Sequence, residues 1–143
     1  MLKNRLILIT ALAVVALPGT AVTSDTTLKT IMQEMRLNFL DISDGFLLDD
    51  FEKIADGALA IAEHPRIPPE QVQRVADELG AEMPVFKNFD VQVHELSLEI
   101  YKAAKERDRA AAVTAYQGMV AACFACHAAY RERVAAVLAE KLQ

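Results

Sequence analysis

The sequence of 143 residues contains no tryptophan, five glycines, five prolines and only two cysteines, Cys123 and Cys126. Two cysteines cannot form a framework of several disulfides, so the chain is not a disulfide-stabilised scaffold. Basic residues are also few, because 15 Lys and Arg stand against 20 Asp and Glu and give a formal net charge of −5. Nucleic-acid-binding domains carry a basic patch, so this balance argues against a nucleic-acid partner.

A strand-like alternation of polar and apolar residues is also absent after the amino-terminal segment. Apolar residues instead recur every three or four positions, which indicates amphipathic helices. The pattern predicts helices over about 28–46, 49–62, 83–106 and 108–142, with a short helical turn over 70–79. Three prolines between His64 and Pro69 predict a connection, and Gly45 is expected to loosen or end the first helix. The predicted fold class is therefore all-α, an antiparallel up-down four-helix bundle.

The first 21 residues have the pattern of a secretory signal peptide. Two basic residues precede an apolar run from Leu6 to Leu17, and the small residues Gly19 and Ala21 follow it. That run is shorter than the about 20 apolar residues of a membrane-spanning helix. We expect cleavage between residues 21 and 24, leaving 22–143 as one exported domain without a membrane anchor. Its 13 basic and 20 acidic residues give a formal charge of −7, and the expected location is the bacterial periplasm.

The most specific pattern in the chain is Cys123-Phe124-Ala125-Cys126-His127, a C-x-x-C-H motif. This spacing is typical of covalent haem attachment, in which both thiols bond to the haem vinyl groups and the histidine binds the iron. Separations of three and four residues place the three side chains on one side of a helix. The motif therefore predicts one covalently bound haem c on the last helix, and the apolar stripe of that helix predicts that His127 faces the interior.

A C-x-x-C pair also occurs in disulfides, redox dithiols and zinc sites. A zinc site normally has four ligands, whereas His64 and His94, the only other histidines, lie far from the motif in sequence. A thioredoxin-like dithiol accompanies a βαβ pattern, and no strand is predicted here. These alternatives rank below haem attachment.

A helical exported chain with this motif in its last helix resembles the class II cytochromes c, the cytochrome c′ family, and cytochrome c′ is a known up-down bundle. The segment from Cys126 to Arg131 is similar to the family pattern, with a basic residue one turn after the histidine. The resemblance implies that His127 is the proximal iron ligand and that helix one faces the opposite axial position. The chain continues further beyond His127 than is usual, so its last turns should project or be covered.

The resemblance leaves Met32 and Met35 as candidates for the distal ligand. The run from Met32 to Ile42 is also similar to the first helix of the bacterial haem-b bundle cytochrome, with Met32 at the ligand methionine and Asn38 at an asparagine. Met32 is therefore the preferred ligand and Met35 the second choice, although methionine on an apolar face also serves as core filling.

A His/Met pair implies an electron carrier with redox partner proteins rather than an enzyme. The alternative function is a five-coordinate cytochrome c′-type protein that binds NO or CO. Arg36 and Arg131 are candidates for contacts with the haem propionates. A second apolar strip on helix one, Leu37, Leu40 and Leu47, predicts a homodimer through helices one and two, as is common in the family, unless the proline-rich connection or the short helix covers it.

Overall fold

The computed structural model describes residues 26–139, and every regular element in this range is helical. The elements are α1 (Leu28–Leu48), α2 (Phe51–Ala62), α3 (Pro69–Leu79), the 3-10 turn η1 (Gly80–Glu82), α4 (Met83–Lys105) and α5 (Arg109–Ala139). The predicted all-α class is confirmed, and the helices begin and end close to the predicted positions. The predicted signal peptide and the last predicted helical residues, 140–142, lie outside the described residues.

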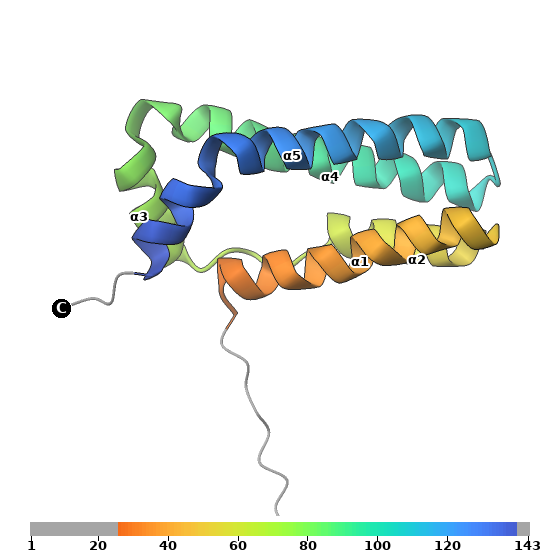
Figure 1. Cartoon of the computed structure of the whole chain (residues 1–143), viewed down its shortest axis with the longest axis horizontal. Coiled ribbons are helices and arrows are strands. Elements are labelled where there is room, and N and C mark those ends of the chain that lie inside the picture. Colours follow the sequence, from red (N-terminus) through yellow and green to blue (C-terminus); the bar gives the residue numbers. More distant parts are fainter. Residues whose placement is uncertain (1–25, 140–143) are drawn as a thin grey trace, which may run out of the picture.

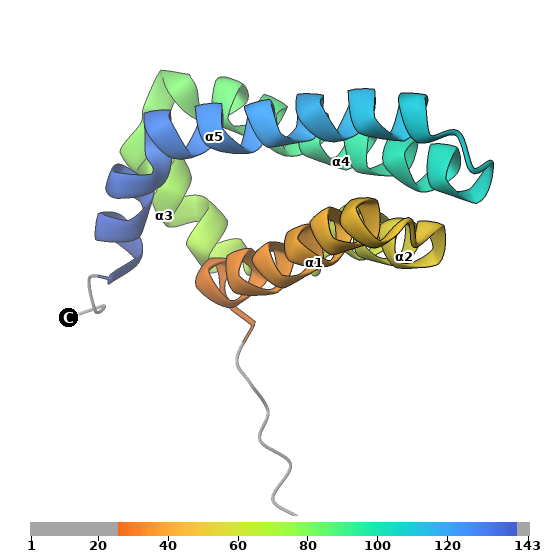
Figure 2. The ribbon, with the colours of Figure 1, turned by 45° about the vertical axis from the view of Figure 1, so that its right-hand side comes forward.

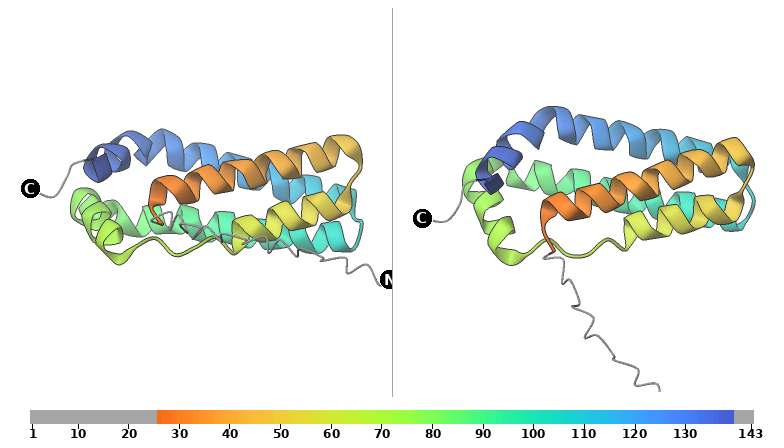
Figure 3. Two further views of the ribbon diagram at one scale, coloured as in Figure 1. Left: turned by 90° about the horizontal axis from the view of Figure 1, so that it is seen from below. Right: turned by 60° about the horizontal axis from the view of Figure 1, so that its bottom comes forward.

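The helices form two side-by-side pairs. Helix α1 packs on α2, α4 packs on α5, and the contact between α2 and α4 joins the pairs. Helix α3 lies across one end of the pairs, where the last turns of α5 bend toward it (Figures 1 and 2). In Figure 3 the connection that precedes α3 runs from the end of α2 to the end of the molecule where α3 lies. Among the described residues, α1 and α5 are not a closely packed pair.

Polar side chains set the beginnings of three helices by accepting bonds from free backbone N–H groups. The Thr27 hydroxyl accepts a hydrogen bond from the Thr30 amide at 3.1 Å at the start of α1. The Asp50 carboxylate accepts from the first turn of α2. The Asp108 carboxylate accepts from the Ala111 amide at 3.0 Å before α5. The helix starts are therefore encoded locally.

Gly45 does not end α1, contrary to the prediction. It is buried inside the helix, which continues to Leu48. A Cβ at Gly45 would lie 2.6 Å from Cγ1 of Ile54 on α2, and one at Gly57 would lie 2.8 Å from the carbonyl oxygen of Asn38 on α1. The two glycines therefore permit a close approach of α1 and α2 rather than a break in the helix.

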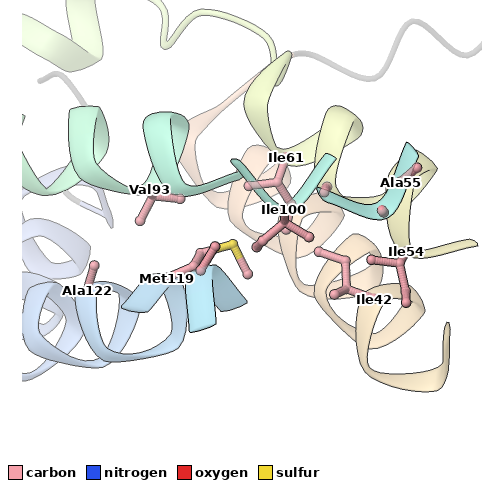
Figure 4. Close-up of a cluster of buried hydrophobic side chains, with 11 residues drawn as sticks. Ile42, Ile54, Ala55, Ile61, Val93, Ile100, Met119 and Ala122 are labelled. Atoms are coloured by element: carbon pink, nitrogen blue, oxygen red, sulfur yellow. The ribbon is translucent and has the colours of Figure 1, made fainter. Parts of the chain in front are cut away.

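Two apolar clusters fill the interior. The main cluster joins α1, α2, α4 and α5, and its members are Ile42, Ile54, Ala55, Ala58, Ile61, Val93, Ile100, Ala104, Ala115, Met119 and Ala122 (Figure 4). The end cluster lies where α3 crosses the pairs, and its members are Leu28, Val75, Leu79, Tyr130 and Val134. The side chains of α5 contribute to both clusters.

Among the described residues, α5 is the one helix that is long and apolar enough to cross a membrane by length and composition alone. A core helix of a helical bundle has the same properties. Helix α5 packs on α4 and on α3, and its apolar residues serve both clusters.

Candidate functional site

Cys123 and Cys126 lie one turn apart on α5, and both are half-buried free thiols. Cys123 packs against the main cluster. Cys126 packs against the end cluster. The C-x-x-C-H motif therefore lies at the junction of the two apolar clusters.

Burial raises the pKa of both thiols. It is the main cause for Cys123, and for Cys126 the nearby Cys123 and the carboxylate of Asp90 add to burial and raise the pKa to about 11. Both thiols are thus protonated at neutral pH. A dithiol oxidoreductase relies on a thiolate with a lowered pKa. These surroundings disfavour a dithiol oxidoreductase and are compatible with thiols that are consumed in thioether bonds.

The prediction that His127 faces the interior is wrong, because its side chain is exposed. The face of α5 that is buried consists of Ala112, Ala115, Met119, Ala122, Tyr130 and Val134. Its small residues let α5 pack closely on α4. Tyr130 and Val134 follow His127 on the same side of α5 and are buried, whereas His127 is exposed, since α1 is not closely packed on α5.

His127 nevertheless lies on the side of α5 that is directed to α1. It follows Tyr116 by eleven residues, which is three helical turns, so the two side chains leave α5 in nearly the same direction. Tyr116 contacts α1 directly. Within residues 26–139, His127 forms no hydrogen bond or ion pair, so its imidazole is available to a ligand.

Tyr116 bridges α1 and α5 at the end opposite to α3. Its ring centroid lies 5.5 Å from that of Phe39 and 5.2 Å from that of Phe46. Its hydroxyl lies 2.6 Å from the hydroxyl of Ser43, at hydrogen-bond distance. Large side chains thus connect two helices whose backbones remain apart.

The two candidate methionines of α1 have different surroundings. Met35 is half-buried and packs against the main cluster. Met32 is 39% exposed. Met35 therefore contributes to the packing of the main cluster, whereas Met32 belongs to neither apolar cluster.

The remaining polar candidates lie at the surface or at helix ends. Arg36 and Arg131 are exposed, and neither forms an ion pair with a described residue. His94 Nδ1 lies 3.0 Å from the carbonyl oxygen of Ala62, the last residue of α2. Within residues 26–139, no group of three or more His, Cys, Asp or Glu side chains is placed to hold a metal ion. A haem needs only one or two protein ligands.

His64 links the α2–α3 connection to α4. Its Nε2 lies 3.4 Å from Oδ1 of Asp90, and its Nδ1 lies 2.8 Å from the carbonyl oxygen of Pro65. Hydrogen bonding to Asp90 is the largest cause that raises the pKa of His64, and the Pro65 carbonyl adds to it. Sequence reasoning missed Asp90 and the bridge by Tyr116, because these contacts join residues that are distant in sequence.

A comparison with protein-family models, with curated proteins and with solved structures finds no match for this chain. The functional assignment therefore depends on the motif and on the geometry around it.

Proposed function

We propose that this chain is an exported class II cytochrome c, of the cytochrome c′ type, that carries one electron through a covalently attached haem with His/Met ligation. One observation carries the proposal. The C-x-x-C-H motif occupies one side of α5, with both thiols half-buried at the junction of two apolar clusters. A haem bound there would supply a one-electron redox centre.

The proposed architecture is an antiparallel up-down bundle of α1, α2, α4 and α5. In its support, only Asp49 and Asp50 separate α1 from α2, and residues 106–108 separate α4 from α5. Such short connections between packed helices reverse the chain direction. Asp49 and Arg107 have φ values of 60° and 58°, the left-handed conformation with which helices commonly end.

The contact between Tyr116 and Ser43 gives a reference level for the axial ligands. Met32 precedes Ser43 by eleven residues, and His127 follows Tyr116 by eleven residues. At 1.5 Å per residue and with α1 and α5 in opposite directions, both lie about 16 Å from this contact. Met35 lies only about 12 Å from it. Met32 and His127 therefore lie at the same height along the two helices, which supports Met32 as the distal ligand.

Each residue of the proposed site has a distinct role. Cys123 and Cys126 would anchor the haem to α5, and His127 and Met32 would be its two iron ligands. The thioether of Met32 favours the reduced iron and raises the reduction potential. Arg36 and Arg131 would pair with the propionates and compensate their negative charge.

The second candidate function is NO or CO binding at a five-coordinate haem. The exposure of Met32, 39%, favours this candidate, because a methionine that stays at the surface leaves the distal position free. Its neighbour Ile31 is 1% exposed, so α1 also directs apolar side chains inward.

The proposed partners are redox proteins or a second copy of the chain. The predicted strip on α1 is exposed, with Leu37 at 54%, Leu40 at 43% and Leu47 at 84%. The alternative that the proline-rich connection or α3 covers it is wrong for the described residues. A groove between α1 and α2 also opens on the surface, and its lining contains four acidic residues, Asp41, Asp50, Glu52 and Asp56, and one basic residue, Lys53. An apolar strip with an acidic surface nearby suits a basic redox partner.

The test is to produce the full chain in the periplasm of a host that attaches haem to C-x-x-C-H motifs. A mass increase by one haem and a sharp low-spin ferrous spectrum that CO leaves unchanged would support the electron carrier. A high-spin spectrum that converts on CO addition would support the gas-binding candidate. A chain without covalent haem would refute both.

A further inference from the structure

Helix α3 holds the start of α1 and the end of α5 at the same time. On the α1 side, the side-chain Oε1 of Gln71 accepts a hydrogen bond from the Leu28 amide at 2.8 Å. That amide belongs to the first turn of α1 and has no partner within its own helix. Gln71 is therefore a cap that comes from a different helix.

On the α5 side, charged groups make the connection. The Arg133 guanidinium donates to the Glu78 carboxylate at 3.1 Å and to the Glu82 carboxylate at 2.8 Å. It also donates to the backbone carbonyl of Glu78 at 3.2 Å. Arg74 of α3 donates in turn to the carbonyl of Val137 on α5. Side chains of both helices thus contribute to this connection.

Apolar contacts fill the space between these polar ones. Val75 and Leu79 of α3 are 2% and 3% exposed. They belong to the same cluster as Leu28 of α1 and Tyr130 of α5. Because α1 and α5 are not closely packed on each other, α3 acts as a spacer between them at this end.

The spacer contacts both helices close to the proposed iron ligands. Leu28 lies one turn before Met32, and Tyr130 lies one turn after His127. We infer that α3 is a positioning element that sets the distance between Met32 and His127, with Gln71 and Val75 as positioning residues. This inference rests on the proposed function. It also gives a role to the part of α5 that follows His127, because α3 packs on these last turns.

The test compares the double variant Gln71→Ala/Val75→Ala with the control Gln73→Ala. Gln73 lies on the exposed side of α3 and bonds only to Asp77 of the same helix. In the haem-loaded double variant we expect a lower low-spin fraction and about tenfold faster CO binding, because a looser spacer populates the open site. The control should match the unaltered protein in both measurements.

A distance measurement gives a second readout that a loss of stability alone would not move. Both native cysteines are occupied in the haem-loaded protein, so spin labels at Lys29→Cys and Glu132→Cys, two exposed sites, report the spacing of α1 and α5. We expect a broader distance distribution in the double variant than in the unaltered protein, and no broadening in the Gln73→Ala control. If that variant does not fold, Gln71→Ala alone should show the same changes at smaller size.

The outcomes separate this inference from the proposed function. An unaltered chain that takes up no covalent haem refutes the proposed function, and the inference with it. An unaltered chain with low-spin haem, together with variants that keep its spectrum, CO binding and label distances, refutes the inference alone.

Discussion

Helices α1 and α5 are connected in different ways at the two ends of the molecule. At one end, Tyr116 reaches Phe39, Ser43 and Phe46 of α1 directly. At the other end, which carries the C-x-x-C-H motif, α3 lies between the helices and contacts both. A direct bridge brings two helices as close as the side chains allow, whereas a spacer keeps them apart. The proposed haem would lie at the end that α3 connects, beside the C-x-x-C-H motif on α5.

The largest expected effect comes from removing both thiols. The variant Cys123→Ala/Cys126→Ala should lose covalent haem completely, because no other cysteine exists in the chain. Mass spectrometry of the denatured protein measures this. The matched control is Phe124→Ala, which removes a side chain that is 67% exposed within the motif and should keep the haem. A double variant that retains the mass of one haem would contradict the proposed attachment.

The next effect concerns the distal ligand. Met32→Ala should convert the low-spin spectrum to a largely high-spin one and open the iron to CO, since the thioether is removed. Met35→Ala is the control, and it should keep the low-spin spectrum while it lowers the free energy of unfolding by about 1–2 kcal/mol through lost core packing. Absorption spectra with and without CO measure the first result. An unchanged low-spin spectrum in Met32→Ala would rule out this ligand.

A smaller effect is expected at the opposite end. Tyr116→Phe removes the hydrogen bond with Ser43 and should lower the free energy of unfolding by about 1 kcal/mol. The haem spectrum should not change, because this end serves only to connect the helices. Tyr101→Phe is a suitable control, since Tyr101 is also half-buried against the main cluster. Urea unfolding measures the difference, and a shift in spin state for Tyr116→Phe would show that the two ends are coupled.

The smallest effect is the pH dependence of the His64–Asp90 pair. Because the pKa of His64 is raised in the folded protein, the pair contributes its full stability below the ordinary histidine pKa of about 6.5. That contribution is lost as the pH rises through the folded pKa. Asp90 is 55% exposed, so we expect a change below about 1 kcal/mol. Urea unfolding below and above this pH range measures the free energy of unfolding, with His64→Gln as the reference. An equal change of this free energy with pH in the two proteins would exclude the effect.

The sequence by itself determined the helical class, the approximate positions of the helices and the motif. Local rules suffice for these features: the spacing of apolar residues, capping by Thr27, Asp50 and Asp108, and the prolines after His64. The C-x-x-C-H spacing likewise places its three side chains on one side of a helix wherever that helix lies.

Only the tertiary structure decided how the helices meet. From the sequence alone, Gly45 is expected to break the helix. In the structure it stays helical, and its missing side chain leaves room for Ile54 of α2. The apolar stripe of α5 predicts that His127 faces the interior, but its side chain is exposed because α1 and α5 are not closely packed on each other. The bonds from Gln71 to α1 and from Arg133 to α3 join residues far apart in sequence. Such contacts depend on the orientation of whole helices, which no local pattern contains.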